Sequence, residues 1–358
     1  MVQNNIKSIA VFYLQMIVIW TGVVTLLIFL RNFGVDPEGR DTLIQGQTLG
    51  QIMTVNLFVG TLAAVFYSTL ELVSEWPYFQ KHSYGRIIFV KFLLFLVCGK
   101  LMMMLGISFS GIIAPKSIAK GEMMALVNSD LYWVLLVYFL LSAAIISFVR
   151  MVSQKFGPGV LWNMMIGKYR SPREEVRVFM FLDLKSSTAI AERLGHIKFS
   201  RLIQSCFADL TPIVKRHNVE IYQYVGDEAV LSWPLEKGFE NNNCLHCYFD
   251  YMALLNRKAS HYLAEYEINP DFKAGVHLGK VIVAEVGLIK REIAYHGDVL
   301  NTTARIQGKC NEFEQKLLVS EAVLPHMKPD QEIQSLRIGE ESLKGKQQKV
   351  TIYAVTKN

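Results

Sequence analysis

Cysteine is scarce in this chain, with five in 358 residues, and only one Cys-x-x-Cys pair occurs, Cys244 and Cys247. A cysteine-based zinc site would need a second such pair, and the sequence has none. The surrounding stretch NNNCLHCYFDYMALLNRKASHYL is typical of one helix that follows an asparagine cap. We therefore interpret both cysteines as part of a helix face. Internal repeats and low-complexity tracts are also absent.

Charged residues are few as well, at 19% of the chain against 51% hydrophobic residues, and the mean hydropathy is +0.26. Such values are unusual for a wholly soluble protein. A bilayer crossing needs about 20 apolar residues, and four runs meet that length: Ile9 to Leu30, Leu49 to Val73, Ile87 to Ser110 and Leu131 to Val152. Runs of this kind with short polar gaps predict four transmembrane helices. The first run lacks a small-residue cleavage site, which argues against a signal peptide.

Basic residues near the ends of these runs predict their orientation. One side is the richer in lysine and arginine: Lys7, Lys81, Arg86, Arg150, Lys155, Lys168, Arg170 and Arg173. We therefore expect a multi-pass protein of the cell (inner) membrane with both termini in the cytoplasm. These flanks explain part of the net charge of +6, and no nucleic-acid partner is needed to account for it. The outward gaps are too short to form ligand-binding domains.

Polar residues inside a membrane span are costly and often functional. Lys100 and Asn56 fall at a similar depth if the second and third runs are antiparallel, and we hypothesise an internal partner or a sensing role for Lys100. Lys91 lies nearer the end of its run, close in depth to Glu71. We interpret Lys91 as a side chain that snorkels to the membrane surface.

The pattern predicts three parts: a membrane domain at 1–152, a linker at 153–175 and an α+β domain at 176–358. The order of elements after Val176 predicts an antiparallel-rich sheet with helices on one face. Two hairpins are expected, one turned by Gly226 and Asp227 and one turned by Gly279.

Two acids follow strands in the α+β part. Asp183 ends the strand VRVFMFLDL, and Asp227 lies in the first hairpin turn. If the strands are neighbours, both carboxylates meet at one sheet edge, where such oxygen ligands suit Mg²⁺. The following helix begins near Ser186, Ser187 and Thr188, and the free N–H groups of a helix N-terminus bind phosphate. The alternative is a helix cap and an ordinary Gly-Asp turn.

A later stretch, YHGDVLNTTARIQGK, carries Asn301 and Arg305 on one helical face. An arginine can stabilise charge that develops on a transferring phosphoryl group, and an asparagine can hold a sugar. A solvent-exposed helix face explains the same pattern. Lys344 and Lys346 follow in a glycine-containing loop and could supply cations for a triphosphate.

These blocks, together with AGVHLGKVIVAEVG and LKGK, resemble the class III nucleotidyl cyclases in order and approximate spacing. The resemblance covers Val176 to about Val355. It implies a ferredoxin-like βαββαβ core that acts as a head-to-tail homodimer on a nucleoside triphosphate, with two Mg²⁺ (or Mn²⁺) ions in each active site. Residue roles carry over by motif: metal binding for Asp183 and Asp227, ribose orientation for Asn301, transition-state stabilisation for Arg305, and phosphate binding for Lys344, with Lys346 as the alternative.

The choice of base stays open at this point. Adenine-selective members of that family often have lysine where this chain has Gln223, and aspartate or threonine where it has Ala294. Guanine-selective members prefer glutamate at the position of Gln223, and this chain lacks that glutamate as well. Glutamine can donate and accept, so it could bind either purine. We favour ATP because it is the commoner substrate in bacterial-looking members, and we expect Tyr295 to help shape the base pocket, together with Tyr222 and His296.

Three alternatives remain beside an adenylate cyclase. One is a guanylate cyclase. Another is a catalytically inactive receptor or dimerisation module, for which the departures at Gln223 and Ala294 leave room. The third is a diguanylate cyclase, because VGDEAV is similar to the GGDEF motif, although Val225 and Ala229 do not fit that pattern.

Overall fold

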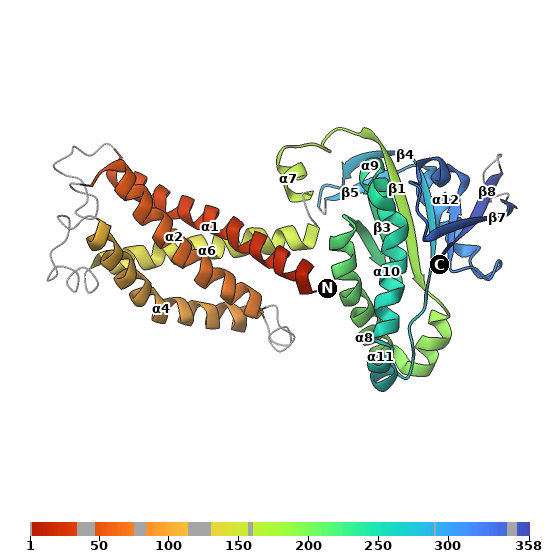
Figure 1. The fold of residues 1–358 in the computed structure, drawn as a ribbon, viewed down its shortest axis with the longest axis horizontal. Coiled ribbons are helices and arrows are strands. Elements are labelled where there is room, and N and C mark those ends of the chain that lie inside the picture. Colours follow the sequence, from red (N-terminus) through yellow and green to blue (C-terminus); the bar gives the residue numbers. More distant parts are fainter. Residues whose placement is uncertain are drawn as a thin grey trace. The chain divides into compact units, whose positions relative to one another are not determined.

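The protein is described here by a computed structural model that covers residues 2–33, 47–74, 84–113, 130–156, 160–289, 291–341 and 349–358 (Figure 1). The chain divides into two compact units, Met1–Met151 and Val152–Asn358. The first unit is helical, and the second contains a mixed sheet with helices, which is the α+β class that the sequence predicts.

Four long helices form the first unit, and each contains a segment that is long and apolar enough to cross a membrane. They are α1 (Val2–Asn32), α2 (Leu49–Ser74), α4 (Tyr84–Ile113) and α6 (Asp130–Phe156). Large apolar side chains such as Val18, Leu57 and Leu141 are exposed on the outside of the bundle, as lipid contact would require. The four predicted spans are confirmed as helices of the expected length.

Small residues allow close packing in this bundle. A Cβ atom on Gly60 of α2 would lie 2.6 Å from Cα of Thr21 in α1, so only glycine permits this approach. Trp20 of α1 and Tyr67 of α2 are almost completely buried in the same bundle, and their ring centres lie 5.6 Å apart. Close approach of small residues is the usual way in which membrane helices gain packing contacts.

The charged residues of the bundle have partners that the sequence did not reveal. Lys91 Nζ lies 2.8 Å from Glu71 Oε1, and Ser147 Oγ donates to the same oxygen at 2.9 Å. The ion pair joins α2 to α4 and gives Lys91 a partner at that depth, and the snorkelling of Lys91 to the membrane surface stays a prediction. Lys100 Nζ lies 5.2 Å from the ring centre of Tyr132, which gives this lysine an aromatic partner.

The second unit is built on an eight-stranded sheet, and its path runs β2-β3-β1-β4-β6-β8-β7, with β5 paired to β4. Among these pairs, β4 and β6 are parallel and the others are antiparallel. The strands are β1 (Arg173–Leu184), β2 (Glu220–Val225), β3 (Glu228–Pro234), β4 (Phe272–Val286), β5 (Glu292–His296), β6 (Leu317–Ser320), β7 (Ile333–Glu341) and β8 (Val350–Lys357). The hairpin turned by Gly226 and Asp227 is confirmed, since it joins β2 to β3.

Helices cover both faces of this sheet, so the prediction of helices on one face is wrong. Alternation along β1 explains the two faces, because successive strand side chains point to opposite sides. Val178 and Met180 pack with α8 (Ser187–Arg216) and α10 (Asn243–Arg257). Phe179 and Phe181 pack on the other side with α12 (Asp298–Gly308). The short helices are α7 (Val160–Met165), α9 (Leu235–Phe239) and α11 (Ala259–Tyr266).

The predicted hairpin at Gly279 does not form, because β4 continues through this residue without a turn. A Cβ atom on Gly279 would lie 2.8 Å from Val299 Cγ2, and one on Gly275 would lie 2.4 Å from the backbone nitrogen of Gln307. Both glycines therefore let α12 lie close to β4. This contact fixes α12 relative to the strand ends where the acids are found.

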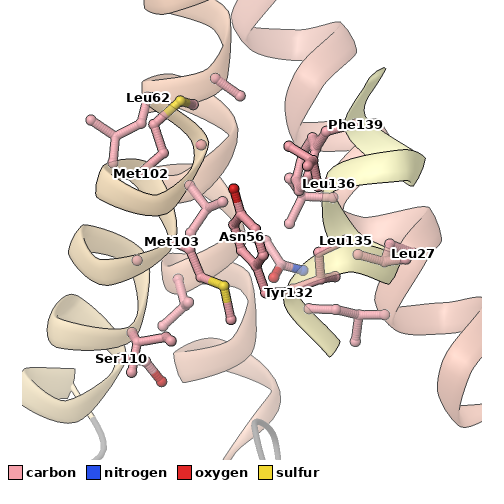
Figure 2. Close-up of a pocket in the computed structure, with 18 of the residues that line it drawn as sticks. Leu27, Asn56, Leu62, Met102, Met103, Ser110, Tyr132, Leu135, Leu136 and Phe139 are labelled. Atoms are coloured by element: carbon pink, nitrogen blue, oxygen red, sulfur yellow. The ribbon is translucent and has the colours of Figure 1, made fainter. Parts of the chain in front are cut away.

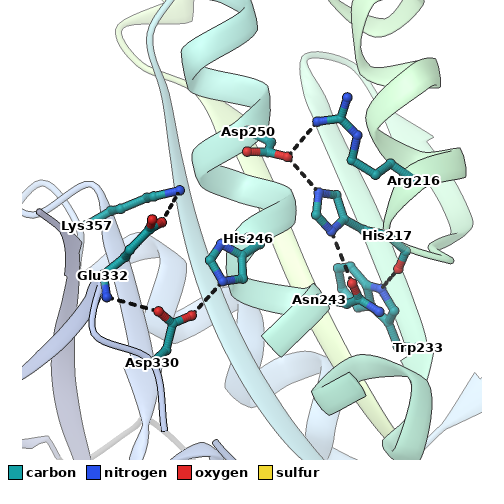
Figure 3. A network of polar contacts seen from close by, with 9 residues as sticks. All are labelled: Arg216, His217, Trp233, Asn243, His246, Asp250, Asp330, Glu332 and Lys357. Carbon is teal, nitrogen blue, oxygen red and sulfur yellow. Dashed lines mark hydrogen bonds and ion pairs between the residues drawn. The ribbon is translucent and has the colours of Figure 1, made fainter. Parts of the chain in front are cut away.

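Helix α10 is held in place at both of its sides (Figure 3). Asp250 accepts from His217 Nε2 at 3.0 Å, in a network that also includes Arg216, and His246 Nε2 contacts Asp330 Oδ2 at 2.7 Å. Cys244 and Cys247 are buried in the same helix, and burial raises the pKa of the Cys244 thiol to about 12. Their interpretation as a helix face is confirmed, although Lys258 separates α10 from α11, so the predicted single helix is two.

Candidate active site

Three acids meet at the sheet edge where β1 ends and β3 begins. Asp183 of β1 is in register with Glu228 of β3 and with Lys273 of β4. Asp227 lies in the two-residue turn before β3, where Gly226 adopts a positive φ of 62°. Antiparallel pairing thus brings together residues that are 44 positions apart in the chain, 183 and 227.

The two predicted metal ligands have different surroundings. Asp183 Oδ2 accepts a hydrogen bond from Gln307 Nε2 at 3.0 Å and lies 3.3 Å from Lys273 Nζ. Asp227 Oδ2 is buried and has no hydrogen-bond partner in the described part of the chain. Burial, and after it the charge of Asp227, raises the pKa of Asp183. A buried carboxylate oxygen without a donor is costly unless a cation binds it.

Glu228 is a third acid that the sequence analysis did not single out. Burial and the charges of Asp183 and Asp227 raise the pKa of Glu228 to about 7. The signal was present in the sequence, because Glu228 follows Asp227 directly at the start of a strand. Among the described residues, no group of three or more histidine, cysteine or acidic side chains is arranged so that it could hold a metal ion by itself. A metal here would therefore need oxygen ligands from a substrate or water as well.

A pH dependence follows from the raised pKa of Glu228. The folded protein keeps Glu228 protonated up to about pH 7. The contribution of this proton to the free energy of unfolding is therefore full below pH 4.5 and is lost as the pH rises through 7. In EDTA at pH 8, Glu228→Gln should raise the melting temperature of the full chain by about 2–4 °C, after allowing for solvent screening. The gain should disappear near pH 4.5. The exposed Glu192→Gln is the control, and an equal gain in both variants would contradict the assignment.

The three residues proposed for phosphate lie at the start of α8, three positions after Asp183. Ser186 is the N-cap and has a positive φ of 58°, and its hydroxyl makes no capping hydrogen bond. Ser187 and Thr188 form the first turn, in which backbone N–H groups have no helical acceptor. The turn is thus a helix N-terminus beside the acids, suited to an anion.

Asn301 and Arg305 both lie on α12. Within the described part of the chain, neither residue forms a hydrogen bond or an ion pair with Asp183 or Asp227. Asn301 is exposed and Arg305 is half-buried. The side of α12 that packs on the sheet carries Val299, Thr303 and Ile306. Gln307, which the sequence analysis missed, is the α12 residue that contacts Asp183.

The predicted base-pocket residues come from two strands. Gln223 is exposed on the edge strand β2, and Ala294 pairs with Ala284 across β4 and β5. The Tyr295 ring lies 4.9 Å from that of Tyr222, and the guanidinium of Arg177 lies 4.9 Å from its centre. Arg177, which no local sequence pattern distinguishes, is buried and forms ion pairs with two glutamates, Glu175 and Glu220. Lys344 and Lys346 lie outside the described residues.

Comparison with known proteins decides the family. Residues 169–357 match the family described as the adenylate and guanylate cyclase catalytic domain, which is more than half of the 358 residues. The chain belongs to this family. The matched residues lie within the second compact unit, and family membership argues against the diguanylate cyclase alternative.

Curated relatives carry the name of adenylate cyclase. Adenylate cyclase 2 of Rhizobium meliloti (strain 1021) is 34% identical over 221 residues, which are 62% of this chain and 61% of the relative. Adenylate cyclase of Anabaena cylindrica is 24% identical over 224 residues, 58% of this chain and 42% of the relative. The chain thus spans less than two thirds of the length of either relative.

A solved bacterial light-regulated adenylyl cyclase is similar to this chain in fold. The TM-score is 0.54 at 17% sequence identity, and the similarity covers 64% of this chain and 66% of the solved one. The α+β sheet with its flanking helices is therefore the cyclase fold. The predicted class III cyclase fold is confirmed.

Proposed function

We propose that the protein is a membrane-anchored adenylate cyclase that converts ATP to 3′,5′-cyclic AMP and pyrophosphate at the interface of a homodimer. The observation that carries this proposal is the pair of acids at one sheet edge, with Asp227 Oδ2 buried and unpartnered among the described residues. Membership of the cyclase family supports a nucleoside triphosphate as substrate. The names of the curated relatives favour ATP.

The residues at the acids fit a divalent cation. The pKa of Asp183 is raised, and Asp227 Oδ2 has no hydrogen-bond donor among the described residues. Added positive charge would stabilise both carboxylates. We propose Mg²⁺ or Mn²⁺, two in each active site, held by Asp183 and Asp227. When bound, such ions favour loss of the 3′-hydroxyl proton and neutralise triphosphate charge. Gln307 and Lys273 hold Asp183 in position through its Oδ2 atom.

The reaction joins the 3′-oxygen to the α-phosphorus and breaks the bond from that phosphorus to the bridging oxygen of pyrophosphate. The hydroxyl proton is lost to solvent or to a nearby acceptor. The first turn of α8, with Ser186, Ser187 and Thr188, would bind phosphate oxygens through backbone N–H groups. Lys344, with Lys346 as the alternative, is the proposed lysine for the leaving pyrophosphate.

The arrangement of α12 supports a site shared between two copies. Gln307 contacts Asp183 of its own chain. Residues two positions apart on a helix do not face the same way, so Arg305 does not share the direction of Gln307. Among the described residues, Arg305 and Asn301 make no hydrogen bond or ion pair to the acids of their own chain, and we assign them to the metal ligands of a second copy. The second copy would return the same contribution, giving two equivalent sites in a symmetric dimer.

The remaining parts of the proposal concern the base and the membrane. Gln223, Ala294 and Tyr295 would contact the purine, with Arg177 and Tyr222 holding the Tyr295 ring. The four apolar helices fit a multi-pass membrane anchor. We propose the cell (inner) membrane, with the cyclase domain and both termini on the cytoplasmic side because the basic flanks lie there.

One assay tests the activity and separates the alternatives. The full chain, purified in detergent, is incubated with Mg²⁺ or Mn²⁺ and either ATP or GTP, and the products are identified by mass spectrometry. We expect cyclic AMP from ATP, and a rate lower by at least about 100-fold in Asp183→Asn. Cyclic GMP as the main product would make the protein a guanylate cyclase. Absence of both products would support an inactive module, and unchanged activity in Asp183→Asn would refute the metal assignment.

A further inference from the structure

The membrane bundle contains a cavity of about 170 Å³ between its four helices (Figure 2). Every helix contributes to its wall: Val24 to Arg31 of α1, Ile52 to Ala63 of α2, Phe95 to Ser110 of α4 and Tyr132 to Phe139 of α6. The lining is mostly apolar, and leucine, isoleucine and valine are its commonest residues. The cavity thus lies in the half of the bundle where α1 and α4 end and where α2 and α6 begin.

Asn56 is the unusual residue of this wall. It is 3% exposed, and Figure 2 shows its amide between the methionines of α4 and the leucines of α6. Its Nδ2 donates to Thr25 Oγ1 at 3.3 Å, but its Oδ1 has no hydrogen-bond partner among the described residues. Among the described residues, the bundle has further buried polar atoms without a hydrogen-bond partner, such as Ser68 Oγ. Of the residues that carry such atoms, Asn56 is the one that lines the cavity.

A hydrogen-bond acceptor in an apolar cavity selects its occupant by chemistry. A lipid acyl chain would fill the volume but would leave Asn56 Oδ1 without a donor, which is costly inside a membrane. A water molecule needs two to four polar partners. Besides Asn56 the wall carries four polar side chains, Arg31, Gln47, Ser110 and Tyr132, and each of them already has an interaction partner. Ser110 also lines the cavity, but its hydroxyl already accepts from Gln47 Nε2 at 3.1 Å.

We propose that this cavity is a binding site for a small neutral molecule that is largely apolar and carries one hydrogen-bond donor. The donor binds Asn56 Oδ1, and the apolar part packs against Met103, Leu136 and Phe139. The size is appropriate, because a cavity of about 150 Å³ lined by apolar side chains holds one benzene ring. A phenol is therefore the simplest molecule with the required size and donor.

The test compares two probes that share a ring and differ in the donor. The full chain in lipid nanodiscs is titrated with 4-fluorophenol and with 4-fluoroanisole, and binding is followed by ¹⁹F NMR. We expect saturable binding of the phenol that is about fivefold to tenfold tighter than that of the ether, as one hydrogen bond would give. Empty nanodiscs measure simple partition of each probe into lipid. If both probes give equal, non-saturable signals with the protein, the proposal is overturned.

Variants then assign the binding to Asn56. Asn56→Leu keeps the size of the side chain, removes the acceptor and should abolish the preference for the phenol. Ser68→Ala is the matched control, because it removes another buried oxygen of α2 that has no partner in the described residues and does not line the cavity. Ser68→Ala should retain the preference.

A second variant fills the cavity. Gly99 lies in its wall, and a Cβ atom there would be 3.3 Å from Leu136 Cδ1. Gly99→Leu should weaken binding of both probes at least tenfold. Melting curves show whether each variant is folded. If Gly99→Leu does not fold, the result for Asn56→Leu alone decides whether the proposal holds. A phenol preference that persists in folded Asn56→Leu would overturn the proposal.

Discussion

Replacing Asp227 by asparagine is expected to lower the rate of cyclic nucleotide formation at least ~10²-fold to 10³-fold and to raise the melting temperature of the metal-free protein by about 2–4 °C. Asparagine keeps the shape of the side chain but removes one of the clustered negative charges. Asp227 Oδ2 is buried without a partner among the described residues, and its charge helps to raise the pKa of Asp183. The same charge that binds cations therefore destabilises the protein without them.

Product formation with Mg²⁺ and melting in EDTA measure the two effects on the same preparation. Asp209→Asn is the matched control, because Asp209 accepts from Lys258 Nζ at 2.6 Å and from Tyr262 at 2.9 Å and is therefore already satisfied. That variant should keep the activity and lose stability. A stable and active Asp227→Asn would refute the role in metal binding, whereas an inactive variant with a lower melting temperature would refute the electrostatic explanation.

The positions of the two acids could be predicted because the signals are local. Asp183 ends an apolar run that can only be a buried strand, and Gly226 before Asp227 marks a tight turn between two such runs. A local pattern of this kind determines the strand end and the turn whatever the rest of the chain does. Their roles as metal ligands stay a prediction until the variants are measured.

The residues that support these acids could not be predicted in the same way. Gln307 reaches Asp183 across 124 positions of sequence, and Lys273 does so from the neighbouring strand. Neither residue has a local pattern that distinguishes it from an exposed polar residue. Buried Arg177 is similar, since its partners Glu220 and Tyr295 come from separate strands. Tertiary packing alone brings such residues together.

Gly279 shows how a correct local signal can have a different cause. Glycine within a strand indicates either a turn or a close backbone approach. A turn was the expected cause, whereas the structure has an uninterrupted β4 against which Val299 of α12 packs. The prediction of helices on one face is wrong for a different reason. The consecutive β1 residues Val178, Phe179 and Met180 are all apolar, so both faces of this strand have to be covered.

Mixing two inactive variants should restore activity if the site is shared between copies. Arg305→Ala is expected to lower the rate ~10²-fold to 10³-fold, like Asp227→Asn. If Asp227→Asn and Arg305→Ala chains pair at random, about half of the dimers are heterodimers. Each heterodimer has one intact site out of two. Coexpression should therefore recover up to about a quarter of the wild-type activity.

The pairing of defects makes this experiment specific. Asp227→Asn mixed with Asp183→Asn should recover nothing, because both defects fall in the same half of every site. Arg305 lies two positions from Gln307, which contacts Asp183 of its own chain, so the helix directs the two side chains differently. Arg305 would then complete the site of the other copy while Gln307 positions the acid of its own. Absence of recovery in the mixture with Arg305→Ala would mean that each copy uses its own arginine. Recovery in the mixture of Asp227→Asn with Asp183→Asn would mean that the two acids of one site come from different copies.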